Sequence, residues 1–259
     1  MPTFLFGEII FGPVNSRRLG CSLGINLLPV DRKLCSFDCL YCECGLNPNA
    51  NAPKAELPTV DEVIKYLELK LQEMTGSGRL PDVITFAGNG EPTLHPNFPE
   101  AIDITCALRD KYCPSAKIAV LSNGTRISSP SVFKALLKVD DNILKLDAGS
   151  ERTIKLLDRP SGHFNLTSYV EDLKRFDGKV IIQSLFIKGQ YNGELIDNYS
   201  DHEVAEWLKL IKYIAQSEVM VYSIARDTPV DSLIKVDGKR LKEIASLVKK
   251  EGIKVQLTE

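Results

Sequence analysis

The chain has 259 residues, of which 44% are hydrophobic and 25% charged, and its 32 basic residues nearly balance 34 acidic ones. The apolar fraction excludes intrinsic disorder, and 17 glycines and 14 prolines are too few for a fibrous or low-complexity chain. A net charge of −2 gives no global attraction to phosphate backbones, so nucleic acid is left open as a partner but is not supported by the charge.

The sequence predicts a cytoplasmic protein without a membrane partner. No stretch reaches the roughly 18 consecutive apolar residues of a membrane span. The apolar start of the chain contains Glu8 and no basic segment, which is atypical of a signal peptide. Seven cysteines, an odd number in a chain of this length, favour metal binding or redox chemistry over a disulfide framework.

From about residue 59 the chain alternates between helical and extended hydrophobic patterns. Residues 59–62, Thr-Val-Asp-Glu, have the capping-box pattern that starts a helix, and the apolar residues after them recur at helical spacing. A buried strand is predicted over 82–87, where a short apolar run ends at a glycine. In the same way the sequence predicts helices over 97–111, 130–138, 202–215 and 239–251, helical material over 151–174, strands over 117–121, 142–147, 180–187 and 219–224, and a last apolar stretch over 253–257.

This alternation indicates an α/β fold. Strands separated by helices imply right-handed βαβ units and a parallel sheet. With a first strand over 23–28 there are about six such units, fewer than the eight of a closed barrel, so we expect an open, partial (βα)6 TIM-like barrel. No composition break marks a linker, and residues 1–259 are predicted to form a single domain. Segments 44–58 and 189–200 are predicted to be polar surface loops.

Three cysteines lie close together in the loop after the first predicted strand. Cys35, Cys39 and Cys42 form a C-x3-C-x2-C array. Three such thiolates can each hold one iron of a [4Fe-4S] cluster and leave the fourth iron open for chemistry. The alternative is a non-catalytic zinc- or iron-sulfur-binding module in which Cys44 or a remote His completes a structural site. The spacing fits zinc less well than two C-x2-C pairs would.

The array, with the aromatic Tyr41 just before its last cysteine, resembles the motif of the radical S-adenosylmethionine (SAM) superfamily. After the next strand, residues 88–92, Gly-Asn-Gly-Glu-Pro, resemble the GGEP motif of that superfamily, which contacts the methionine amino group of SAM. Asn89 replaces the first glycine, and Asn also tolerates left-handed backbone geometry. Residues 11–20 are similar to the opening of a branch that includes the wyosine-forming tRNA enzymes. Those enzymes have further upstream cysteines, whereas here only Cys21 precedes the array.

The resemblance implies a partial barrel of the radical SAM type over the whole chain and a defined chemistry. Cys35, Cys39 and Cys42 would ligate the cluster, and SAM would bind the fourth iron through its amino and carboxylate groups. An electron from a donor such as flavodoxin or ferredoxin would cleave SAM to methionine and a 5′-deoxyadenosyl radical, which abstracts a hydrogen from substrate. The substrate, an RNA base, a peptide or a small molecule, is left open.

Polar residues at the ends of other predicted strands extend the candidate site. Ser122 and Asn123 end the third strand, in a segment that lies near SAM in the superfamily, although Asn-Gly is also an ordinary turn signal. Lys145 and Asp147 alternate with leucines, so they share a face that should turn into the barrel lumen. Alternatively, these two residues only neutralise each other as an ion pair.

Gln183 is a polar residue in an apolar run and needs a hydrogen-bonding partner, for which SAM is suitable. Arg226 follows the sixth strand, where it could hold a carboxylate or phosphate, and Arg159 is a weaker candidate for the same role. The catalytic candidates are Lys145, Asp147 and Arg226. The predicted cofactor-binding residues are Gly88, Asn89, Gly90, Glu91, Ser122, Asn123, Asp147 and Gln183.

Overall fold

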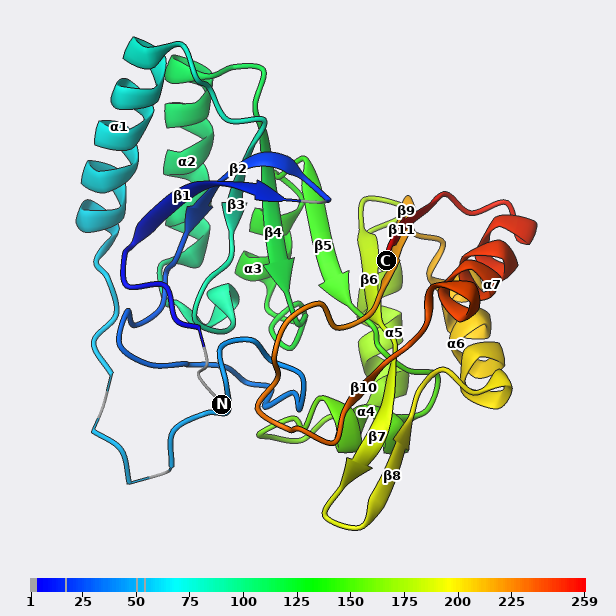
Figure 1. Ribbon diagram of the computed structural model, residues 1–259. Coiled ribbons are helices and arrows are strands. Elements are labelled where there is room, and N and C mark those ends of the chain that lie inside the picture. Colours follow the sequence, from blue (N-terminus) through cyan, green and yellow to red (C-terminus); the bar gives the residue numbers. More distant parts are fainter. Residues whose placement is uncertain (1–3, 17, 50, 54) are drawn as a thin grey trace. The chain divides into compact units, whose positions relative to one another are not determined.

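A computed structural model describes residues 4–16, 18–49, 51–53 and 55–259. The chain divides into two compact units, each of which is described by itself (Figure 1). The N-terminal unit comprises Leu5–Cys35 and Asn47–Asn142, and the C-terminal unit comprises Phe4, Ser36–Leu46 and Ile143–Glu259. No helix in the described ranges is long and apolar enough to cross a membrane.

The N-terminal unit contains strands in the order β1-β2-β3-β4. Strands β2 (Gly20–Ile25), β3 (Val83–Phe86) and β4 (Lys117–Ser122) are parallel, as predicted, and β1 (Ile10–Ser16) pairs antiparallel with β2. The strand predicted over 23–28 therefore begins earlier and ends at Ile25. Strand β1 was not predicted because it lies at the sheet edge, is mostly exposed and contains Pro13, so it shows no regular alternation.

The helices of the N-terminal unit are α1 (Val60–Ser77), α2 (Phe98–Tyr112) and α3 (Pro130–Leu136), and α1 and α2 lie side by side (Figure 1). The predicted capping box is confirmed. Thr59 accepts a hydrogen bond from the backbone of Glu62, and the Glu62 side chain accepts one from the backbone of Thr59. The apolar face of α1 is buried, through Val63, Leu67, Leu71 and Met74.

The C-terminal unit has parallel strands in the order β5-β6-β9-β11, of which β5 contributes its last three residues. These strands are β5 (Asp141–Lys145), β6 (Ile181–Leu185), β9 (Glu218–Tyr222) and β11 (Val255–Thr258). The helices are α4 (Glu151–Leu157), α5 (Leu166–Lys174), α6 (Asp201–Ile214) and α7 (Gly238–Lys250). The helical material predicted over 151–174 is observed as two helices, α4 and α5. Pro160 cannot donate a helical hydrogen bond, and Asn165 caps the new helix α5.

The prediction of a polar loop over 189–200 is wrong, because this segment contributes to a hairpin. Strands β7 (Ile187–Tyr191) and β8 (Glu194–Asp197) pair antiparallel, and β10 (Ile234–Lys235) joins β7 in a second small sheet (Figure 1). Asn192 and Gly193 make the turn with φ angles of 50° and 80°. Two successive positive φ angles at Asn-Gly are typical of the type I′ hairpin turn, a signal that the sequence did contain.

The strand register in the C-terminal unit separates a polar face from an apolar one. Lys145, Gln183 and Met220 are neighbours across β5, β6 and β9. Leu144 and Ile182 point the other way and are fully buried. On that opposite face Trp207 of α6 donates to the Ser184 hydroxyl at 3.0 Å. Helix α6 therefore covers the apolar face, and Lys145 and Gln183 lie on the face away from it.

Candidate functional site

The loop after β3, residues 88–92, approaches other backbone segments too closely for side chains. Gly88 and Gly90 have φ angles of 140° and 141°, and a Cβ at Gly90 would lie 1.9 Å from the Leu34 carbonyl oxygen. Leu34 donates to the Asn89 carbonyl at 2.8 Å and accepts from the Glu91 backbone at 3.1 Å. The glycine-rich loop is thereby bound to the backbone immediately before Cys35.

Glu91 connects this loop to the end of β4. Its carboxylate is 1% exposed and accepts hydrogen bonds from Thr93, from the Ser122 hydroxyl at 2.8 Å and from the Asn123 backbone at 2.6 Å. Burial raises the pKa of Glu91, and these hydrogen bonds oppose the shift. The prediction that this carboxylate contacts SAM stays a prediction. The structure shows it holding Ser122 and Asn123 beside the glycine loop.

Asn123 in turn lies beside the first cysteine of the array. Its side-chain amide donates to the Cys35 sulfur at 3.5 Å. The Asn47 side chain brackets Cys35 by accepting from its backbone N–H and donating to its carbonyl, both at 3.1 Å. The N-terminal unit therefore brings together Cys35 and six predicted cofactor-binding residues, namely Gly88, Asn89, Gly90, Glu91, Ser122 and Asn123.

The other two cysteines belong to the C-terminal unit, in a segment that we call the cysteine loop, residues 36–44. Cys39 is 7% exposed and Cys42 is half-buried. The backbone of Cys42 donates to the Cys39 carbonyl at 3.2 Å, which makes a tight turn between them. The backbone of Leu40 donates to the Leu157 carbonyl at 3.0 Å, so the loop is attached to the end of α4.

The donor set fits an iron-sulfur cluster. The structure contains no disulfide among the seven cysteines, all of which lie in its described part. Within the described ranges no three His, Cys, Asp or Glu side chains surround a position for a single metal ion. The three cysteines of the array, Cys35, Cys39 and Cys42, are nevertheless the residue type that a [4Fe-4S] cluster takes as ligands, and an amide donor at the Cys35 sulfur suits an anionic thiolate. The assignment of Cys35, Cys39 and Cys42 as the cluster ligands stays a prediction.

A buried polar cluster in the C-terminal unit contains Lys145 and Asp147, together with two residues that the sequence did not single out for it. The Tyr41 hydroxyl contacts the Asp147 carboxylate and lies 3.0 Å from Asp158, and Lys145 donates to that hydroxyl at 2.6 Å. Lys145 also forms an ion pair with Asp147 at 3.2 Å. The other Asp147 oxygen accepts from the Leu185 backbone at 2.8 Å, so the fully buried carboxylate is occupied by the protein itself.

The Asp147 carboxylate stabilises the charge of Lys145 and disfavours a charge on Asp158. Burial, reinforced by Asp147, raises the pKa of Tyr41 well above its usual range. Burial by itself lowers the pKa of Lys145, but Asp147 and the other acidic groups around it together outweigh burial, and the pKa is raised. Burial and Asp147 together raise the pKa of Asp158. At neutral pH, Tyr41 is therefore neutral and Lys145 is a cation. The sequence signalled Lys145 and Asp147 by their alternation with leucines, and Tyr41 only by its aromatic position in the array.

The remaining predicted residues lie at different places. Gln183 is 8% exposed and neighbours Lys145 on the polar face of the sheet. Arg226 follows β9 and forms an ion pair with Glu43 of the cysteine loop, with 70% of its side chain exposed. Arg17, which belongs to the opening segment 11–20, lies outside the described residues.

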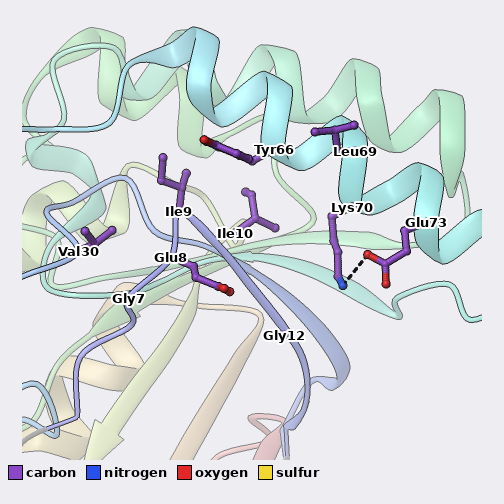
Figure 2. A pocket seen from close by; sticks show the side chains of 10 residues that line it. All are labelled: Gly7, Glu8, Ile9, Ile10, Gly12, Val30, Tyr66, Leu69, Lys70 and Glu73. Carbon is purple, nitrogen blue, oxygen red and sulfur yellow. Dashed lines mark hydrogen bonds and ion pairs between the residues drawn. The ribbon is translucent and has the colours of Figure 1, made fainter.

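A separate groove of about 550 Å³ lies in the N-terminal unit between β1 and α1 (Figure 2). Figure 2 shows Tyr66 and Leu69 of α1 above Ile10, with the ion pair of Lys70 and Glu73 at one end. The residues that line this groove include none of the predicted site residues.

The sequence identifies the family of the chain. Residues 33–202 match the family model described as the Radical SAM superfamily, and the chain belongs to that superfamily. The matched range contains the cysteine array, the glycine-rich loop and the polar residues of β5 and β6. The resemblance inferred from the two motifs is confirmed.

Among relatives, the chain is 32% identical over 223 residues to a Brachyspira hyodysenteriae protein named GTPase Obg. The matched region is 85% of this chain and 30% of that protein. The chain spans 30% to 60% of the length of four curated relatives that it matches.

Solved structures show the same fold. A radical SAM methyltransferase from Sphaerobacter thermophilus superposes with a TM-score of 0.67 at 16% identity, covering 92% of this chain and 65% of that one. A structure of TYW1 with a lysine-pyruvate adduct bound superposes with a TM-score of 0.58 at 13% identity, covering 88% and 73%. The predicted fold class, an α/β partial barrel of the radical SAM type, is therefore confirmed.

Proposed function

We propose that the chain is a radical SAM enzyme that binds one [4Fe-4S] cluster through Cys35, Cys39 and Cys42 and cleaves SAM reductively. The observation that carries the proposal is the superfamily match over 33–202, which includes both the cysteine array and the glycine-rich loop. When bound, the cluster supplies the single electron that this cleavage needs, while the protein binds and orients the reactants. A flavodoxin- or ferredoxin-type donor and a cytoplasmic location complete the proposal, and the substrate class is left open.

The N-terminal unit offers the binding surface for the methionine end of SAM. Gly88 and Gly90 are half-buried, and the absence of a Cβ lets the loop pack directly against Asn26 and the Leu34 carbonyl, beside Cys35. Glu91 holds Ser122 and the Asn123 backbone against this loop, so the polar groups near Cys35 are pre-arranged. Pre-arranged donors and acceptors bind a charged amino acid group with little loss of side-chain entropy.

The polar face of the C-terminal unit supports the rest of the cofactor and the substrate in this proposal. Gln183 offers an amide from the middle of β6, and Lys145 offers a cation whose side chain is 15% exposed. Asp147 keeps Lys145 charged and in place. Arg226 lies on a surface loop, where a guanidinium can hold a substrate carboxylate or phosphate.

Anaerobic reconstitution with iron and sulfide tests this function. The wild-type chain should become brown with about four irons per chain and, with a chemical reductant, should release methionine and 5′-deoxyadenosine from SAM. Changing Cys35, Cys39 or Cys42 singly to Ala should abolish both the visible absorption and the cleavage, because each thiolate holds a different iron. Cys44→Ala is the matched control and should keep both.

Two results contradict this assignment. A colourless wild-type chain that binds zinc favours the structural module over the enzyme. Loss of the cluster in Cys44→Ala indicates a site with four cysteine ligands, which has no open iron for SAM.

A further inference from the structure

The cysteine loop is held along one side by the segment 157–161, which begins at the last residue of α4. The backbone N–H of Asp38 donates to the Asp158 carbonyl at 2.9 Å, and that of Leu40 donates to the Leu157 carbonyl at 3.0 Å. In return, Ser161 donates to the Ser36 carbonyl at 2.9 Å. These bonds flank Cys39, so the segment fixes the backbone on both sides of a proposed ligand.

Asp158, Arg159 and Ser161 each contact the loop with both backbone and side chain, and Arg159 also contacts Tyr191. The Arg159 carbonyl accepts from the Asp38 backbone at 3.2 Å, and its guanidinium lies 3.5 Å from the Asp38 carboxylate. The same guanidinium lies 5.2 Å from the centre of the Tyr191 ring and donates to the Tyr191 hydroxyl at 3.3 Å. Arg159 thus connects the cysteine loop to the end of strand β7.

The backbone of Arg159 is unfavourable by itself. Its φ of 48° lies in the left-handed region, which residues other than glycine rarely adopt. The contacts with Asp38 and Tyr191 offset that cost, and the side chains of Arg159 and Asp38 are 33% and 19% exposed, so solvent screens their ion pair only in part. A second ion pair to the loop, between Arg226 and Glu43, is far more exposed and contributes less.

We propose that Arg159 is a positioning residue for the iron-sulfur cluster. Together with Tyr191 it holds the cysteine loop in its ligand-presenting conformation before the cluster is inserted, and it slows loss of the cluster afterwards. The role in cluster retention rests on the proposed function, whereas the hold on the loop does not.

Hydrogen exchange of the chain without its cluster tests the hold on the loop. Arg159→Gly removes the side chain and also relieves the left-handed backbone, so the variant should fold. The Asp38 and Leu40 amides should exchange about fivefold faster than in wild type, because an ion pair and a cation–π contact are each weak. In Arg159→Lys these amides should exchange at a rate between those of wild type and Arg159→Gly, because lysine keeps the charge but not the planar stacking.

Arg152→Ala is the matched control. It removes the ion pair between Arg152 of α4 and Glu194 of β8, which does not involve the cysteine loop. The Asp38 and Leu40 amides should then exchange at the wild-type rate. Amides of the buried strand β6 should be unchanged in every variant, because the effect is local.

Cluster loss is the second readout. After reconstitution, the visible absorption should decay several times faster in Arg159→Gly than in wild type when an iron chelator is added, and Arg152→Ala should match wild type. Adding Asp38→Asn to Arg159→Gly should not accelerate the loss further, because both changes remove the same contact.

Unchanged exchange at Asp38 and Leu40 in Arg159→Gly overturns the inference, whatever the chain catalyses. An equal increase in the exchange rate of all amides also overturns it, because Arg159 then contributes to the stability of the whole unit. Faster loop exchange with unchanged cluster loss overturns the role in cluster retention. If the wild-type chain takes up no cluster, the proposed function fails, and the exchange experiment still decides whether Arg159 holds the loop.

Discussion

Glu91 and Asp147 are buried carboxylates, 1% and 0% exposed, whose oxygens are occupied by donors from other segments. Glu91 binds groups at the end of β4, and Asp147 binds Lys145 and the Leu185 backbone. A buried carboxylate without such donors is strongly unfavourable. Both side chains therefore organise the residues around them, and each substitution has a structural and a functional readout.

Glu91→Ala should weaken SAM binding by about 1.5 to 3 kcal/mol, the range for a hydrogen bond to a charged group. The physical reason is loss of the carboxylate together with the arrangement of Ser122 and Asn123 that it maintains. Isothermal titration calorimetry measures this, with Glu100→Ala as the control because Glu100 is an exposed carboxylate in the first turn of α2. An unchanged affinity in Glu91→Ala shows that residues 88–92 are only a turn.

Lys145 and Asp147 can be tested as a pair. Asp147→Ala leaves the Lys145 charge without its ion-pair partner and should destabilise the chain by about 3 to 5 kcal/mol in urea unfolding. If the two residues serve only each other, replacing both with Met or Leu should be close to neutral, and SAM cleavage should survive. We expect the double variant to fold and keep its cluster but to lose turnover. Full 5′-deoxyadenosine production and substrate turnover in that variant would falsify a functional role.

Helix α1 shows how a local pattern stabilises an element and makes it sensitive to pH. Thr59→Ala removes the N-cap and should destabilise the chain by about 1 kcal/mol. The hydrogen bond from the Thr59 backbone lowers the pKa of Glu62 below its ordinary value of 4.5. The stability from this contact is therefore present above pH 4.5 and is lost as the pH falls through the lower, folded-state pKa.

Glu62→Ala should accordingly be less stable than wild type at neutral pH, and the difference should shrink as the pH falls below 4.5. Urea unfolding at a series of pH values measures it. Glu62→Gln, which keeps an acceptor for the cap without the charge, is the control and should remove this part of the pH dependence. A difference between Glu62→Ala and wild type that stays constant with pH contradicts this explanation.

At the scale of the whole molecule, the charge balance bears on RNA as a partner. A net charge of −2 leaves no global attraction to a phosphate backbone. Binding of an unrelated single-stranded RNA, followed by fluorescence anisotropy, should be weak and should change by less than about tenfold between 50 and 200 mM salt. If the affinity for RNA falls by about a thousandfold or more between these salt concentrations, the chain makes many phosphate contacts, and the expectation is contradicted.

The sequence by itself determined the family, the proposed ligands and most of the regular elements, because these depend on local spacing. The array of Cys35, Cys39 and Cys42, the glycine-rich loop and the capping box of α1 each lie within a few residues. Strands and helices that bury one face repeat with fixed periods, so β3, β4 and α6 were found close to their observed bounds.

Only the tertiary structure decided which side chains meet. Tyr41 and Asp158 are 117 residues apart in the chain, and Arg159 reaches both Asp38 and Tyr191. The return of the chain after α4 brings these groups together, and no local pattern encodes that return. The edge strand β1 escaped sequence prediction for another reason: it pairs with β2, which follows closely in the chain, but its exposed residues and the irregular register between Phe11 and Val14 leave no hydrophobic period of its own.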